Sequence, residues 1–148
     1  MLITHITKNY KQTQKLGEDF AKKILKMPVK NNAIVLGLRG NLGGGKTTFL
    51  QGFAKGLGIK EKILSPTFVI LKRFKIKKTE KNFYHIDCYR LKDSKDILEI
   101  DFKKIISDPK NIVAVEWVEK IKEVLPKNII TITFKFIAEE KREIKFKM

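Results

Sequence analysis

The sequence predicts a single α/β domain of three layers, with helices on both faces of a central mixed, mostly parallel sheet. Two continuous apolar runs, at residues 33–38 and 112–117, are typical of strands that are buried on both faces. Apolar residues at helical spacing follow the first run. The last twenty residues alternate apolar and polar side chains, which predicts an antiparallel hairpin at one edge of the sheet.

The length of 148 residues accommodates one ordinary domain with a sizeable core, so we expect one domain over residues 1–148. No apolar run approaches about eighteen residues, so we expect no membrane span. The first residues lack the basic start and apolar stretch of a signal peptide. The chain has one cysteine, Cys88, and so cannot form an internal disulfide. These features predict a cytoplasmic protein.

The chain is strongly basic, with 32 lysine and arginine residues against 16 aspartate and glutamate residues and a net charge of +16. Such a charge attracts nucleic acid or an acidic protein surface. The lysines are scattered through every segment, however, and no basic patch is interleaved with aromatic residues. A lysine-rich solvated surface is the simpler interpretation, and the charge alone does not predict nucleic-acid binding.

The first elements of the chain are predicted to be structural. Residues 2–7 alternate apolar and polar side chains, as in a short edge strand. Thr13 is a candidate N-cap for an amphipathic helix that runs to about Met27, and Pro28 ends it. Tyr10 lies just before this helix and could stack on a base, although a half-buried structural tyrosine is the commoner case.

The central motif of the chain is Gly40-x-x-x-x-Gly45-Lys46-Thr47, the spacing of a P-loop, directly after the strand at 33–38. Glycines let the backbone approach an anion closely, and consecutive N–H groups at a helix start form a nest for phosphate. Lys46 would reach the β and γ oxygens, and the Thr47 hydroxyl would bind Mg²⁺. A glycine-rich turn with a chance lysine is the alternative, which the strand before and the helix after it disfavour.

A helix is predicted from Thr47 onward, and Gly56 and Gly58 supply its stop signals. After it, two runs rich in β-branched and aromatic residues flank the polar residues 79–82, which predicts a β-hairpin. Ser65-Pro66-Thr67 stands at the entrance of this hairpin. Thr67 could sense a γ-phosphate or Mg²⁺, although these three residues alone indicate a plain turn.

The second strand of that hairpin carries an acidic residue in apolar surroundings. In a strand, His85, Asp87 and Tyr89 share one face. A carboxylate there is unfavourable unless it meets a partner or a cation, so Asp87 is a candidate for the Mg²⁺ shell or for positioning an attacking water. A lone aspartate in a strand is about as often part of a structural ion pair, which Asp87 could form with Arg90. A P-loop in the same chain favours the functional interpretation.

The last third of the chain adds a second acidic residue at a strand end. A short helix is predicted from Asp96 to about Ile106, and the strand at 112–117 follows it. Glu116 lies at the carboxyl end of this strand, the position of a Walker-B type acid beside a P-loop, and fits a role on the metal side. Trp117 is predicted to pack. A short helix over 118–125 and the hairpin strands at 129–137 and 142–148 complete the chain.

Four segments together resemble one family. GNLGGGKTTF, LSPTF, HIDCYRL and VEW, in this order, resemble the TsaE family of small bacterial P-loop ATPases, which are needed to form threonylcarbamoyladenosine in certain tRNAs. The resemblance spans nearly the whole chain and implies the P-loop NTPase fold with ATP and Mg²⁺ as cofactors. Asn41 stands where the family usually has an acid, and Gly44 where alanine is usual, so affinity and loop rigidity are expected to differ modestly.

The resemblance also implies roles for single residues. Lys46, Asp87, Glu116 and Thr67 would act in catalysis, with Asp87 near the γ-phosphate. Thr47 and Glu116 would bind Mg²⁺. The phosphates would be held by the loop and the start of its helix, that is by Gly43, Gly44, Gly45, Lys46, Thr47 and Thr48. In such a family the ATPase is weak alone and is stimulated by the protein partners that transfer the threonylcarbamoyl group; hydrolysis resets that complex, and contact with tRNA is indirect or weak.

Two other functions fit some of the residues. A small-molecule or nucleoside kinase shares the P-loop, but such kinases usually close an arginine-rich lid over the phosphates, and the C-terminal third offers strands instead. The second alternative function is a basic RNA-binding module with a vestigial P-loop. In that case Lys46→Ala would leave function intact while surface charge reversal abolished it.

Overall fold

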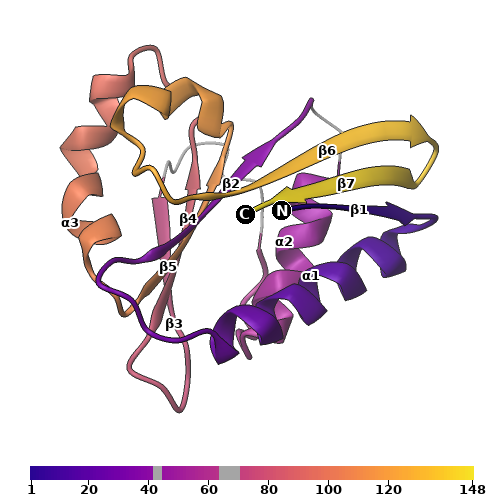
Figure 1. Cartoon of the computed structure of the whole chain (residues 1–148), viewed down its shortest axis with the longest axis horizontal. Coiled ribbons are helices and arrows are strands. Elements are labelled where there is room, and N and C mark those ends of the chain that lie inside the picture. Colours follow the sequence, from indigo (N-terminus) through magenta and orange to yellow (C-terminus); the bar gives the residue numbers. More distant parts are fainter. Residues whose placement is uncertain (42–44, 64–70) are drawn as a thin grey trace.

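Among the residues that the structure describes, seven strands form one mixed sheet. The structure is a computed structural model of the whole chain, and it describes residues 1–41, 45–63 and 71–148. The strand order is β1-β7-β6-β2-β5-β4-β3 (Figure 1). The strands are β1 (Leu2–Thr7), β2 (Ile34–Arg39), β3 (Leu71–Lys75), β4 (Asn82–Asp87), β5 (Asn111–Glu116), β6 (Ile130–Ala138) and β7 (Lys141–Lys147).

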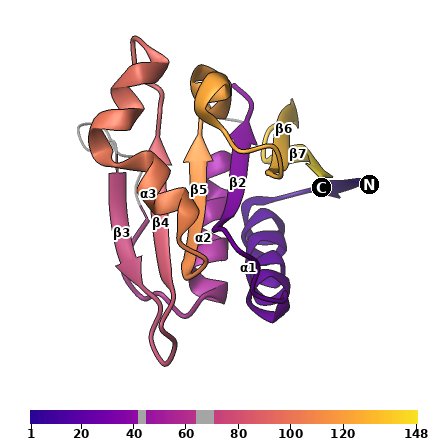
Figure 2. The same ribbon diagram turned by 60° about the vertical axis from the view of Figure 1, so that its left-hand side comes forward.

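Helices lie on both faces of this sheet, as the two apolar runs predict. Figure 2 shows α2 behind the central strands and α3 in front of them. The helices are α1 (Tyr10–Lys26), α2 (Lys46–Gly56) and α3 (Phe102–Ser107), with 3₁₀ helices η1 (Ser94–Ile100) and η2 (Val118–Val124). In the described part of the chain, no helix has the length and apolar character needed to cross a membrane.

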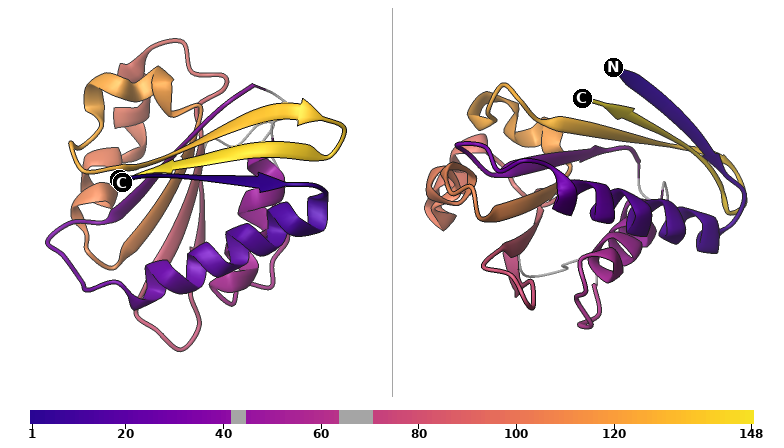
Figure 3. Two further views of the ribbon diagram at one scale, coloured as in Figure 1. Left: turned by 45° about the vertical axis from the view of Figure 1, so that its right-hand side comes forward. Right: turned by 60° about the horizontal axis from the view of Figure 1, so that its bottom comes forward.

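The sheet is less parallel than predicted. β2 pairs in parallel with β5 and β6, and β4 with β5, whereas the β1–β7, β6–β7 and β3–β4 pairs are antiparallel. The C-terminal hairpin forms as expected but is not the edge of the sheet, because β1 pairs along the outside of β7. The two chain termini therefore lie side by side (Figure 3), and the Met1 amino group donates to the Met148 carbonyl at 3.2 Å.

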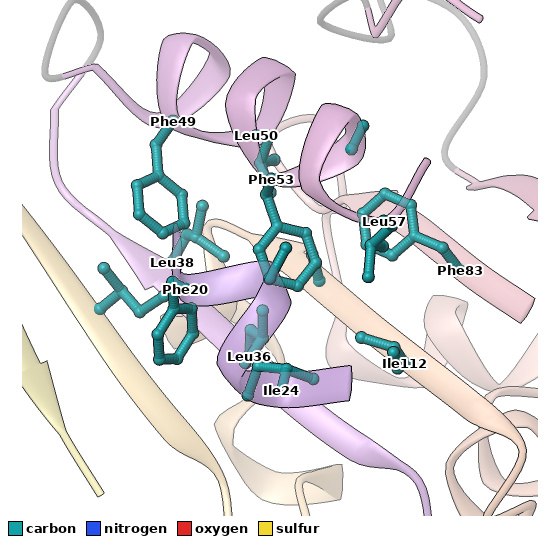
Figure 4. Close-up of a cluster of buried hydrophobic side chains, with 14 of the residues drawn as sticks. Phe20, Ile24, Leu36, Leu38, Phe49, Leu50, Phe53, Leu57, Phe83 and Ile112 are labelled. Carbon is teal, nitrogen blue, oxygen red and sulfur yellow. The ribbon is translucent and has the colours of Figure 1, made fainter. Parts of the chain in front are cut away.

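Two separate cores hold the helices to the sheet. The core under α1 and α2 is rich in phenylalanine, and Phe53 of α2 lies 5.5 Å from Phe83 of β4, measured between ring centroids. Figure 4 shows how these rings and the leucines of β2 interlock. The core on the opposite face contains Val113 of β5, Phe102 of α3 and Ile121 of η2. β5 is buried along its whole length because both faces are covered.

Close contact between α1 and α2 depends on two glycines. A Cβ added at Gly52 would lie 1.9 Å from the Gln14 carbonyl oxygen, and one added at Gly17 would lie 2.2 Å from the Phe49 carbonyl oxygen. Real Cβ atoms do not approach backbone so closely, so only glycine allows this helix spacing. The contact fixes α2, and with it Lys46 at the start of α2, against α1.

Several helix boundaries differ from the prediction. α1 begins three residues before Thr13, because the Asn9 side chain accepts from the Gln12 N–H at 2.9 Å and is the N-cap. Thr13 is instead buried, and its hydroxyl bonds to that of Thr7. The helix predicted over 96–106 is divided into η1 and α3 at Asp101, whose φ of 57° is left-handed.

Candidate functional site

The site lies at the carboxyl ends of three neighbouring parallel strands. In the β4–β5 register Asp87 stands opposite Glu116, and in the β2–β5 register Leu38 stands opposite Glu116. β2 then leads into Gly40 and the glycine-rich loop. Ile112 and Ala114, which precede Glu116 on the same face of β5, belong to the core under α2. The two carboxylates therefore lie on the sheet face that the helix after the loop covers.

Lys46 is the first residue of α2 and is 95% buried. Its ammonium donates to the carbonyl oxygen of Gly40 and, at 3.4 Å, to that of Asn41. Burial lowers the pKa of Lys46, while the charges of Glu116, Glu119 and Asp87 act in the opposite direction. The lysine is thus folded back onto its own loop by weak neutral acceptors. An anionic ligand would be a stronger acceptor for the same group.

Glu116 is almost completely buried, and His85 is its hydrogen-bond partner. The His85 Nε2 atom lies 2.6 Å from Glu116 Oε2, and both side chains are at most 3% exposed. His85 lies on β4 two residues before Asp87, on the same face of the sheet. The sequence places His85 and Asp87 on one face, but it does not reveal the bond from His85 to Glu116.

Asp87 ends β4 and is buried. Its Oδ1 accepts from the backbone N–H of Tyr89 at 2.9 Å. Burial raises the pKa of Asp87, the Tyr89 N–H opposes this, and the charge of Glu116 raises the pKa further. The prediction that Tyr89 shares the strand face is wrong, because the strand ends at Asp87 and Tyr89 lies in the turn that follows.

Trp117 extends over the site rather than only packing. Its backbone has a φ of 57°, which turns the chain directly after Glu116 into η2. The Lys46 ammonium lies 4.2 Å from the centroid of the indole ring, a cation–π distance. The centroid of the Tyr89 ring lies 5.2 Å from the centroid of the Trp117 ring. The Trp117 ring thus borders the lysine, and the Tyr89 ring packs against the Trp117 ring.

Backbone geometry at both ends of the loop explains its outer glycines. Gly40 has a φ of 137°, and a Cβ there would lie 2.5 Å from the Phe134 carbonyl oxygen. Gly45 has a φ of 100°, and the side chain of Arg142 on β7 lies beside it. Neither position suits another residue. Arg142 is buried and donates to the Ala138 carbonyl at 2.9 Å; the sequence gives no signal that this strand borders the loop.

The remaining predicted site residues divide into two groups. Thr47 and Thr48 lie in the first turn of α2 and are partly exposed. Gly43, Gly44 and Thr67 lie outside the residues that the structure describes. The structure therefore brings together Lys46, Asp87 and Glu116 at the start of α2, and it adds His85, Trp117 and Arg142, which the sequence does not assign to the site.

The described residues include oxygen groups of the kind that bind a magnesium ion together with phosphate and water. No group of three or more histidine, cysteine or acidic side chains that could hold a metal occurs among them. Mg²⁺ is usually bound through one or two protein oxygens together with phosphates and water. The Thr47 hydroxyl and the Glu116 carboxylate are donors of that kind, and His85 occupies only one of the two Glu116 oxygens.

Most of the chain matches a protein-family model. Residues 7–144 match the model described as "Threonylcarbamoyl adenosine biosynthesis protein TsaE". The matched range includes every site residue named above.

Sequence relatives and a solved structure agree with this match. A TsaE protein of Bacillus subtilis is 40% identical over 112 residues, 76% of this chain and 68% of the relative. One from Rickettsia prowazekii is 35% identical over 139 residues, 93% of this chain and 90% of the relative. The crystal structure of Bacillus subtilis YdiB superimposes with a TM-score of 0.73 at 29% identity, covering 99% of this chain and 84% of that one. The chain therefore belongs to the TsaE family.

Proposed function

We propose that the protein is a P-loop NTPase that binds ATP with Mg²⁺ and hydrolyses it, as one subunit in the formation of threonylcarbamoyladenosine in tRNA. The observation that carries the proposal is the meeting of three charged, buried side chains at one end of the sheet. Lys46, Asp87 and Glu116 come from three different elements and lie where β2 passes into the loop. Charged groups are rarely buried together unless a ligand or a partner compensates them.

Lys46 would bind the β- and γ-phosphate oxygens. Its ammonium donates to the loop carbonyls of Gly40 and Asn41. A phosphate offers charged acceptors in place of neutral ones, and hydrogen bonds to charged acceptors are roughly twice as strong. The N–H groups at the start of α2, with Gly45, Thr47 and Thr48, would add further donors. Gly43 and Gly44 are proposed to complete this cradle.

Asp87 would orient the attacking water near the γ-phosphate. Its raised pKa brings it closer to the range in which a carboxylate accepts a proton efficiently. The Tyr89 N–H holds one carboxylate oxygen and so fixes the direction of the side chain. Thr67 is proposed to join this arrangement from its loop.

Thr47 and Glu116 would hold the magnesium ion. Bound there, it would supply positive charge beside the phosphate oxygens. The contribution of the chain itself is to present a hydroxyl from the first turn of α2 and a carboxylate from the end of β5. Glu116 is already fixed in place by the bond from His85.

The role in tRNA modification rests on the family. The matching model and the relatives from Bacillus subtilis and Rickettsia prowazekii are named for threonylcarbamoyladenosine biosynthesis. We propose that ATP turnover resets the protein partners that transfer the threonylcarbamoyl group, that these partners stimulate it, and that contact with tRNA is indirect or weak.

Phosphate release from ATP tests the catalytic part of this proposal. We expect Mg²⁺-dependent release by the wild type and a loss of about a hundredfold in Lys46→Ala, because removing one such transition-state contact costs several kcal/mol. Lys55→Ala, at an exposed lysine of the same helix, is the matched control. Transfer of the phosphate to a nucleoside, with no release to water, would instead assign the protein as a kinase.

A further inference from the structure

The hydrogen bond between His85 and Glu116 joins two side chains that have almost no contact with solvent. The Nε2 and Oε2 atoms are 2.6 Å apart, and the exposed fractions of the two side chains are 2% and 3%. An ionised carboxylate only accepts hydrogen bonds, so the imidazole Nε2 donates. A bond of this length to a charged acceptor belongs to the strong class.

We propose that His85 is a positioning residue that orients Glu116 for the magnesium ion and keeps it apart from Lys46. The inference rests on the proposed function, because it assumes that Glu116 faces a metal. His85, which lies on β4, would then support the magnesium ion through Glu116, which lies on β5.

The sheet register explains how His85 reaches Glu116. His85 stands opposite Ala114, and Asp87 stands opposite Glu116, so the contact runs diagonally across the β4–β5 pair. Diagonal neighbours are within reach of long or aromatic side chains. Ala114 has only a methyl group, which leaves the imidazole room to extend along the sheet face. One step further down the same face, Phe83 belongs to the apolar core. His85 is therefore the first polar group above that core.

The bond fixes one carboxylate oxygen of Glu116 and leaves the other oxygen available to a metal ion. A glutamate has three side-chain torsions, and a strong bond to a buried ring selects one arrangement of them. Metal-binding carboxylates are commonly held by such partners, whose removal typically lowers metal affinity 10- to 100-fold. His85 is held by β4 and β5 and has little freedom to move.

The bond also separates two opposite charges. The Lys46 ammonium lies 4.2 Å from the ring centroid of Trp117, the residue directly after Glu116, so the lysine and the carboxylate belong to the same buried site. A buried carboxylate that lost its donor would seek the nearest cation. Because His85 satisfies Glu116, Lys46 donates to the loop carbonyls and stays available for phosphate.

The test measures binding without turnover. Isothermal titration calorimetry with a non-hydrolysable ATP analogue, repeated over a range of Mg²⁺ concentrations, gives the apparent Mg²⁺ affinity of the bound state. We expect His85→Leu to weaken that affinity by about tenfold or more. His85→Gln, whose amide can still donate to Glu116, is expected to retain most of it. Should His85→Leu not fold, His85→Asn takes its place, because its shorter amide cannot reach Glu116.

A double-mutant cycle shows whether His85 acts through Glu116. In the Glu116→Gln background, His85→Leu should cause no further loss of Mg²⁺ affinity. Equal Mg²⁺ affinity in wild type and folded His85→Leu, with a loss in Glu116→Gln, would overturn the role of His85 and leave the proposed function standing. If the wild type bound the ATP analogue equally well with and without Mg²⁺, both the role of His85 and the proposed function would be overturned.

Discussion

The ammonium group of Lys46 lies 4.2 Å from the centroid of the Trp117 ring. Trp117 is the only tryptophan in the chain, so its emission reports this contact without interference. A phosphate would draw the ammonium from its present position, because a charged acceptor is stronger than the Gly40 and Asn41 carbonyls.

We therefore expect ATP or ADP to change the Trp117 fluorescence in a saturable way. Lys46→Met should weaken nucleotide affinity about 10- to 100-fold, since a hydrogen bond to a charged group contributes roughly 1.5–3 kcal/mol. Fluorescence titration measures both effects. Nucleotide binding seen by calorimetry but without any change in emission would show that Lys46 does not leave the ring.

Asp87 is predicted to destabilise the fold at neutral pH. Its pKa is raised in the folded protein, mainly by burial, so the folded state binds the proton more tightly than the unfolded state. Asp87 therefore lowers the free energy of unfolding. This effect is absent below the ordinary aspartate pKa of about 3.9 and grows as the pH rises through the raised pKa of the folded protein. Asp87→Asn should therefore unfold at higher urea concentration than wild type at pH 7, with the difference shrinking towards pH 4.

The same variant should lose ATP hydrolysis, because the amide cannot accept a proton from water. Asp101→Asn is a matched control at an exposed aspartate outside the site, and it should follow wild type at both pH values. An Asp87→Asn protein less stable than wild type at pH 7 would contradict the burial argument.

Gly52→Ala should destabilise the protein although alanine favours helix. Helix propensity alone would add up to about 1 kcal/mol of stability. The new Cβ would lie 1.9 Å from the Gln14 carbonyl oxygen, so α1 and α2 must separate, and overpacking of this kind typically costs about 1–3 kcal/mol. Chemical denaturation measures the net loss. Lys55→Ala, on the same helix but exposed, should stay within about 0.5 kcal/mol of wild type.

Cys88 should be inert in the folded protein. The side chain is completely buried, and burial together with the Asp87 charge raises the pKa of its thiol to about 12. A thiol reagent at pH 8 is therefore expected to label no cysteine in the native protein and one per chain in urea. Rapid labelling of the native protein would show that the end of β4 opens readily.

Strong local patterns account for the parts of the fold that the sequence predicts. The apolar runs of β2 and β5 and the alternation in β6 and β7 each identify a strand, and Gly40 to Thr47 mark the turn into α2. Glu116 could be placed at a strand end because it closes an apolar run, whereas the pattern predicts Asp87 inside its strand, which ends there instead.

Long-range pairing accounts for what the sequence does not predict. Nothing local indicates that β1 pairs outside β7, which adds a third antiparallel pair to the six strand pairs found among the described residues. Asn9 and Thr13 are both good N-caps, but Thr13 is buried within α1, where its hydroxyl bonds to that of Thr7. The bond from His85 to Glu116 depends on the register of two strands that lie about thirty residues apart in the sequence.

The most direct test of the account is ATP hydrolysis measured with and without the protein partners that transfer the threonylcarbamoyl group. We expect slow Mg²⁺-dependent release of phosphate by the protein alone, strong stimulation by the partners, and loss of both in Glu116→Gln, at a residue 97% buried beside the loop. Turnover that the partners do not change, or that Glu116→Gln retains in full, would contradict the account.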